Sequence, residues 1–236
     1  MKIIVGNWKM YLDEKQSVAF AKKLNKLTPK HKFIICPSFT SIEPVGRVLD
    51  FKKMSLGSQD AFWSDFGAYT GEVSALDLKR LKCKYIILGH SERRKYFGET
   101  YETVNKKLKH VLEIGLTPIV CVGESAEERK AKKTWAVIKK QLDTAFRGIK
   151  KDKQILVAYE PIWAIGTGNP ETPEDANKIQ KAIKKNLKSP KIKVLYGGSV
   201  DAKNYKSFLK EKNIDGLLIG GASVKFKEIS KIINNL

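Results

Sequence analysis

Eight short apolar runs punctuate this chain, and they constrain its fold more than any other feature of the sequence. The runs are Ile3–Gly6, Phe33–Cys36, Ser55–Gln59, Tyr85–Gly89, Thr117–Val122, Gln154–Tyr159, Lys193–Tyr196 and Gly216–Ile219. Each has the length of a β-strand and is apolar throughout, which predicts strands that are buried on both faces. The stretches between them are amphipathic with helical spacing. Strands that alternate with helices require crossover connections and therefore a parallel sheet.

The helical stretches carry their own start and stop signals. Val104, Leu108 and Val111 recur at helical spacing, and Gly115 then stands where a C-cap glycine is expected. Ser74 precedes one helix, and Thr172 precedes another whose first residue is a proline. Eight strand–helix units in 236 residues predict a single α/β domain over residues 1–236, closed as a (β/α)8 barrel. A doubly wound open sheet is the main alternative.

The charge is strongly positive, because 45 lysines and arginines face 25 acidic residues, for a net +20. The basic residues recur as pairs in nearly every expected helix: Lys22–Lys23, Lys106–Lys107, Lys132–Lys133, Lys139–Lys140 and Lys184–Lys185. A nucleic-acid surface would instead gather basic and aromatic residues on one face. The distribution favours a solvated coat, and no specific nucleic-acid partner is expected.

The chain shows no signal for a membrane or an oxidising compartment. No apolar run approaches the ~20 residues that cross a bilayer, and the start of the sequence is too short for a signal peptide. Cys36, Cys83 and Cys121 lack metal-ligand spacing and lie in or near apolar runs. We expect reduced thiols and a cytoplasmic protein.

In a barrel the loops that follow the strands carry the chemistry. Asn7 and Lys9 follow the first run, and alternation places both on the same side of an extended segment. A lysine in a barrel mouth is costly unless it meets an anion. His90 follows the fourth run, directly before Ser91, which is a good N-cap for a short helix. Glycine-rich turns follow the last two runs, where free backbone N–H groups favour a phosphate.

Glu160 directly follows the sixth run and opens a loop rich in glycine and aliphatic residues. A loop of that composition on a surface is unusual unless it covers something. Glu160 is then either a catalytic carboxylate beneath a moving lid or an incidental acid in a tight, partly buried connection.

Taken together, these segments resemble the triosephosphate isomerase family, and the resemblance spans the whole chain. The segments that carry it are Asn7–Lys9, Gly71–Glu72, Gly89–Arg94, Cys121–Glu124, Tyr159–Gly168, Tyr196–Val200 and Gly220–Gly221. The strings Gly-His-Ser-Glu-Arg-Arg and Tyr-Glu-Pro-x-Trp-Ala-Ile-Gly-Thr-Gly are highly specific to that family.

The resemblance implies the TIM-barrel fold and the interconversion of dihydroxyacetone phosphate and glyceraldehyde 3-phosphate, a step of glycolysis and gluconeogenesis. Glu160 would be the base, strengthened by burial beneath apolar residues such as Ile165. His90 would donate a hydrogen bond as a neutral imidazole. Lys9, paired with Glu92, would supply positive charge, and Asn7 a further donor. No metal or organic cofactor is implied.

The same resemblance assigns phosphate binding to backbone N–H groups of Gly166, Ser199, Gly220 and Gly221. It also implies a homodimer, in which the Asp65–Glu72 loop inserts into the neighbouring subunit. Thr70 would then lie near the partner's active site, and Glu72 would pair with Arg93.

One segment departs from the family. The loop after Glu160 ends in Asn169–Pro170–Glu171 rather than in a small flexible triplet. Proline fixes its own φ and restricts Asn169, so we expect lid rotation to shift to Gly166 and Gly168. Two other functions remain open from the sequence. One is an aldose–ketose isomerase with another sugar phosphate, and the other is a basic binding protein on an inactive barrel.

Overall fold

Eight parallel strands close into a barrel in the computed structural model, which describes residues 1–150, 152–166 and 170–234. Each strand pairs with the next in sequence, and β8 returns to β1, where Ile3 pairs with Gly216. The strands are β1 (Ile3–Asn7), β2 (Lys32–Cys36), β3 (Met54–Ser58), β4 (Cys83–Leu88), β5 (Thr117–Val122), β6 (Ile155–Tyr159), β7 (Ile192–Tyr196) and β8 (Gly216–Ile219). The eight predicted strands and the closed (β/α)8 barrel are confirmed, and the open sheet is excluded.

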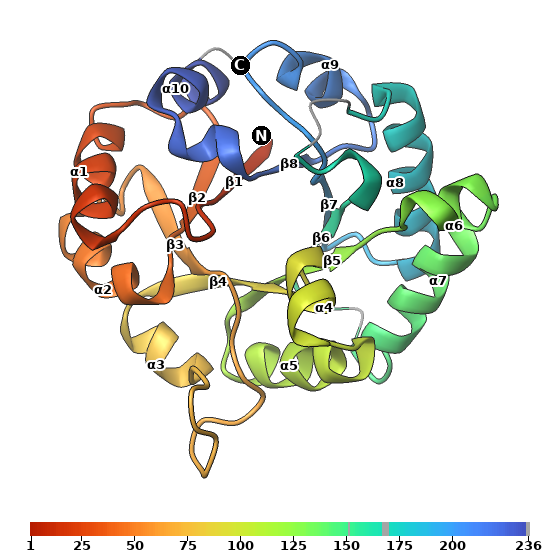
Figure 1. The fold of residues 1–236 in the computed structure, drawn as a ribbon, viewed down its shortest axis with the longest axis horizontal. Helices are drawn as coiled ribbons and strands as arrows, with labels where there is room; N and C mark the ends of the chain where they lie inside the picture. The colour runs from red at the N-terminus through yellow and green to blue at the C-terminus, as the bar shows by residue number, and fades with distance from the viewer. Residues whose placement is uncertain (151, 167–169, 235–236) are drawn as a thin grey trace.

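Helices surround the barrel as an outer ring (Figure 1). The α-helices of the described residues are α1 (Glu14–Leu24), α2 (Phe39–Val48), α3 (Ala75–Arg80), α4 (Ser91–Phe97), α5 (Tyr101–Glu113), α6 (Ala126–Lys130), α7 (Thr134–Ala145), α8 (Pro173–Leu187), α9 (Tyr205–Lys210) and α10 (Phe226–Asn234). Two 3-10 helices, η1 (Ile162–Ala164) and η2 (Gly221–Val224), follow β6 and β8. None of the described helices is both long enough and apolar enough to cross a membrane.

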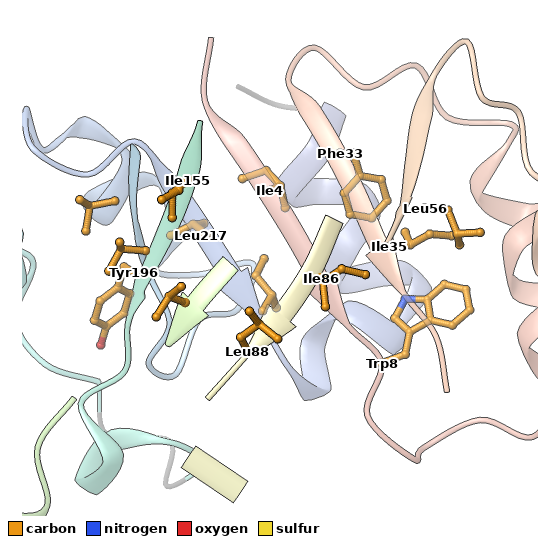
Figure 2. Packing of buried hydrophobic residues seen from close by; sticks show 14 of the residues in the cluster. Ile4, Trp8, Phe33, Ile35, Leu56, Ile86, Leu88, Ile155, Tyr196 and Leu217 are labelled. Atoms are coloured by element: carbon orange, nitrogen blue, oxygen red, sulfur yellow. The ribbon is translucent and has the colours of Figure 1, made fainter. Parts of the chain in front are cut away.

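The core has two layers because successive strand residues point to opposite faces. Val5, Ile34 and Leu195 belong to the cluster that fills the barrel. Their neighbours Ile4 and Phe33 belong to the larger cluster packed against the helices. Figure 2 shows this outer cluster, with side chains of several strands lying side by side. Burial of both faces explains why the strands read as continuous apolar runs rather than alternating ones.

The predicted helix signals agree with the structure except at one cap. Ser74 and Thr172 cap α3 and α8 by accepting backbone N–H groups. Ser91, predicted as an N-cap, is instead the first residue of α4, and His90 occupies the capping position. The reason is that the imidazole of His90 accepts the backbone hydrogen bond that a serine hydroxyl would otherwise take.

Candidate active site

A pocket of about 540 Å³ opens at the carboxyl ends of the strands, and every residue that the sequence nominates for the site lines it. These residues are Asn7, Lys9, His90, Glu160, Gly166, Ser199, Gly220 and Gly221. They follow β1, β4, β6, β7 and β8, so the closure of the barrel brings them together.

Lys9 is held at the pocket in a strained backbone conformation. Its φ of +51° lies in the left-handed region, which costs a non-glycine residue on the order of 1 kcal/mol. The Lys9 N–H donates to Oδ1 of Asn7 at 3.1 Å, and the side chain of Gln59 donates to the Lys9 carbonyl at 2.8 Å. Lys9 Nζ lies 2.5 Å from Oε1 of Glu92, which confirms the expected pair. Because Oδ1 of Asn7 already accepts the Lys9 N–H, Asn7 can bind a ligand through its Nδ2 donor.

His90 presents an N–H donor to the pocket. Gly89, with a φ of +70°, turns the chain from β4 into His90. The Nδ1 atom of His90 accepts the N–H of Glu92 at 3.2 Å. A ring nitrogen that accepts carries no proton, so the proton of the neutral imidazole lies on Nε2. Nε2 is 3.2 Å from Oε1 of Glu160.

Glu160 is buried at the end of β6, with only 1% of its surface exposed. Its Oε2 accepts the N–H of Ser91 at 3.1 Å. The chain packs tightly here, since a Cβ added to Gly123 would lie 1.7 Å from the Glu160 carbonyl oxygen, so only glycine fits. Burial, with the Glu160 carboxylate nearby, raises the pKa of the Cys121 thiol well above its ordinary value, which keeps that thiol neutral.

Backbone N–H groups line the other side of the pocket. Among the described residues, those of Ser199 and Gly221 have no hydrogen-bond partner and are available to an anion. The hydroxyl of Ser199 donates to the carbonyl of Ala164 at 2.6 Å and thereby joins the β7 turn to η1. A Cβ at Gly220 would lie 3.2 Å from Cε of Lys9, so the β8 turn adjoins the lysine.

A group of buried charges supports the peptide that carries His90. We call it the Lys107 cluster, and its members are Asp60, Arg93, Glu99 and Lys107. Lys107 donates to both oxygens of Asp60, at 2.9 and 2.7 Å, and also to Glu99. Arg93 Nε lies 2.8 Å from Asp60 Oδ2. Glu99 Oε2 in turn accepts the N–H of Gly89 at 3.1 Å, which fixes the residue before His90.

Sequence reasoning missed two parts of the site. One is the N–H of Ser91, which holds Glu160 and follows no recognisable pattern. The other is the outer wall of the pocket, which includes Lys203 and Lys225. Both lysines stand shortly after the glycine-rich turns, and that spacing is a signal that was available in the sequence.

Three expectations from the sequence are not tested by the described residues of a single chain. Glu72 is exposed, and within the described part of the chain Arg93 pairs with Asp60 and Glu99 rather than with Glu72. A contact between Glu72 and Arg93 across subunits therefore stays a prediction, as does the placement of Thr70. The expected hinge residue Gly168 and the restricted Asn169 lie outside the described residues, so the shift of lid rotation to Gly166 and Gly168 also stays a prediction.

Comparison with known proteins gives one consistent family. The family model described as triosephosphate isomerase matches residues 2–236. A triosephosphate isomerase of Dictyoglomus turgidum is 44% identical over 99% of each chain. Relatives with the same name from Thermoanaerobacter sp. and Picosynechococcus sp. are 43% and 42% identical over 98% of each chain. Fold, site and similarity agree over the whole length, and the chain belongs to the triosephosphate isomerase family.

Proposed function

We propose that this chain interconverts dihydroxyacetone phosphate and D-glyceraldehyde 3-phosphate by proton transfer through an enediolate. The observation that carries the proposal is the pairing of Glu160 with the Nε2–H of His90, 3.2 Å apart in a pocket that also holds Lys9 and Asn7. A buried carboxylate can move a proton between adjacent carbons, and a neutral N–H donor beside it can stabilise the oxyanion that forms.

Glu160 acts as the base. It takes a proton from one carbon of the substrate and returns it to the next. Its burial excludes competing water from the carboxylate.

His90, Lys9 and Asn7 stabilise the charge that develops on the substrate oxygens. The Nε2–H of His90 donates to the oxygen that becomes negative. Lys9 brings a fixed positive charge, and its pairing with Glu92 aims the ammonium group. The Nδ2 of Asn7 adds a donor whose orientation is fixed by the bond at Oδ1.

The phosphate occupies the side of the pocket formed by Gly166, Ser199, Gly220 and Gly221. Backbone N–H groups there meet the phosphate oxygens without the desolvation cost of another charged side chain. Holding the phosphate fixes the reacting carbons relative to Glu160, and such positioning contributes several kcal/mol to catalysis, about 7–11 in well-oriented systems.

We also propose a homodimer in which the Asp65–Glu72 loop contacts the neighbouring subunit. This loop projects from the barrel between β3 and α3 (Figure 1). Phe66 is 73% exposed and Tyr69 is 45% exposed. Met10, Tyr11, Tyr96 and Phe97 are exposed as well, on segments that also follow strands β1 and β4. Exposed apolar side chains that gather at one end of a molecule mark an interaction surface.

The dimer has a direct test. Phe66→Asp should shift the protein toward monomer in analytical ultracentrifugation, whereas Trp135→Asp, at an exposed tryptophan on α7, should not. A wild-type chain that sediments as a monomer at micromolar concentration would contradict the dimer.

The remaining proposals concern partners and compartment. The buried thiols Cys36, Cys83 and Cys121 fit a reducing, cytoplasmic environment. The net charge of +20 should give only weak nucleic-acid binding that is lost steeply with salt. Tight, sequence-selective RNA binding at physiological salt would favour a binding protein instead.

The function is tested by turnover of glyceraldehyde 3-phosphate in a coupled assay. The expected result is conversion to dihydroxyacetone phosphate that His90→Gln and Glu160→Gln both suppress. In D₂O the product should carry deuterium at the carbon that gains the proton. Selective turnover of a different sugar phosphate would identify another aldose–ketose isomerase.

A further inference from the structure

A second group of buried charges lies beside Glu160. We call it the Arg129 cluster, and its members are Glu124, Arg129 and Glu171. Glu124 and Glu171 are almost completely buried, at 0% and 2% exposed, whereas the Arg129 side chain is 33% exposed. One nitrogen of the Arg129 guanidinium lies 3.1 Å from Oε1 of Glu124 and 2.6 Å from Oε1 of Glu171. None of these residues lines the pocket.

Glu124 holds the chain on both sides of the base. Its Oε1 accepts the hydroxyl of Tyr159, the residue before Glu160, at 3.2 Å. The same oxygen accepts the indole N–H of Trp163 at 3.1 Å. The Arg129 guanidinium lies over the Trp163 ring, 4.4 Å from its centroid. One carboxylate and one guanidinium therefore fix the turn in which Glu160 stands.

Glu171 lies at the far end of the segment that begins with Glu160. Its N–H donates to the hydroxyl of Tyr196 on β7 at 3.2 Å, directly before the Thr172 cap of α8. Its carboxylate reaches back to Arg129. Through this contact Arg129 joins the start of α8 to the turn around Trp163.

This arrangement is not the one that stability alone would favour. A single cation faces two buried acids, and Oε2 of each acid has no partner among the described residues. Burial raises the pKa of the Glu171 carboxyl above its ordinary value, although Arg129 opposes the shift. Buried and incompletely paired charges are often replaced by neutral groups at no loss of stability. A carboxyl group buried at this position therefore needs a reason other than folding.

We propose that Arg129 and Glu171 are positioning residues for Glu160, which clamp both ends of its segment through Glu124 and Trp163. The inference rests on the proposed function of Glu160 as the base. Neither residue touches substrate. The clamp keeps the carboxylate in line with the carbon it deprotonates, where displacement of about 1 Å costs up to ~100-fold in rate.

The test compares Glu171→Gln, Arg129→Gln and the double variant with the wild type, by kcat, KM and urea unfolding. Glu174→Gln, at an exposed glutamate in the first turn of the same helix, is the matched control. Each single variant should lower kcat roughly ten-fold with KM within about two-fold, because phosphate binding is untouched. The double variant should lose no more than the single ones, since the two residues act as a unit. Glu171→Gln should unfold at the same urea concentration as the wild type or a higher one.

Arg129→Lys sharpens the test, because lysine keeps the charge but loses the planar group that stacks on Trp163. Its kcat should lie between those of the wild type and Arg129→Gln. The clamp is refuted if Glu171→Gln matches Glu174→Gln in kcat, if the losses of the single variants add in the double one, or if kcat falls only as far as folded protein is lost. A wild-type chain without turnover would overturn the proposed function, and the clamp with it.

Discussion

The Lys107 cluster and the Arg129 cluster both place buried charges next to residues of the pocket, yet they are built differently. The Lys107 cluster, beside His90, matches two cations with two acids. Its central lysine side chain is 4% exposed. The Arg129 cluster, beside Glu160, has one cation for two acids, and that cation is 33% exposed.

The difference indicates what each cluster does. The Lys107 cluster balances its charges, although burial raises the pKa of Asp60 to about 6, and its Glu99 fixes Gly89, the residue before His90. Within the described part of the chain, the Arg129 cluster leaves Oε2 of both acids without a hydrogen bond, and it reaches both ends of the Glu160 segment. We expect the first cluster to contribute mainly to stability and the second mainly to the placement of the base.

Removing the central cation should separate the clusters most clearly. Lys107→Met leaves Asp60 and Glu99 buried with only Arg93 nearby, which should cost about 3–5 kcal/mol in the free energy of unfolding. Arg129→Gln also leaves two buried acids, but it should cost less, about 1–2 kcal/mol, because the glutamine amide can still donate to them and water can reach the partly exposed site. Urea unfolding of both variants measures the difference, with Lys106→Met, the neighbouring lysine, as control. Equal losses in the free energy of unfolding would show that the two clusters do not differ in their contribution to stability.

The next effect concerns the base that the Arg129 cluster holds. Glu160→Asp withdraws the carboxylate by about 1 Å and should lower kcat by ~100-fold or more, with KM changed only several-fold. The phosphate contacts are untouched, which is why affinity survives. Steady-state kinetics decide the point, and Glu174→Asp serves as control. A rise in KM without a fall in kcat would remove Glu160 from the role of base.

A smaller effect is expected in the pH dependence of stability. Because burial raises the pKa of Glu171 in the folded state, the native protein binds more protons than the unfolded chain between the ordinary value of 4.5 and the raised value. The free energy of unfolding attributable to Glu171 therefore decreases as pH rises through that window and is level above it. When the urea midpoints of both proteins are measured from pH 4 upward, the midpoint of the wild type should fall relative to that of Glu171→Gln. A difference that is constant with pH would show that Glu171 is not strained by burial.

The smallest effect belongs to charges outside both clusters. With a net charge of +20, kcat/KM for a phosphorylated substrate should decline as ionic strength rises. Lys225→Gln removes a cation from the pocket wall and should lower kcat/KM about two-fold at low salt, while Lys227→Gln, outside the pocket lining, should have less effect. No dependence on salt would show that the charge plays no part in substrate capture.

Much of the fold could be read from local pattern. The strand runs, the caps at Ser74 and Thr172 and the glycine at 115 depend on neighbours in sequence, so they survive without knowledge of the fold. The resemblance then assigned the site residues, and the barrel places all of them around one pocket. The cap at His90 was missed, and Ser91 was predicted in its place, because histidine is an unusual capping residue, and only the orientation of the His90 ring shows that it takes the position.

By itself, the sequence determined the alternation of strands and helices, the family, and the residue types that meet at the carboxyl ends of the strands. Tertiary structure alone decided which nitrogen of His90 carries the proton, that the Ser91 N–H binds Glu160, and which residues pair within the two charge clusters. The physical reason is distance along the chain. Lys107 meets Asp60, and Arg129 meets Glu171, across separations that no local period encodes. Such contacts follow from barrel closure, and only the packed structure fixes which buried charges find a partner.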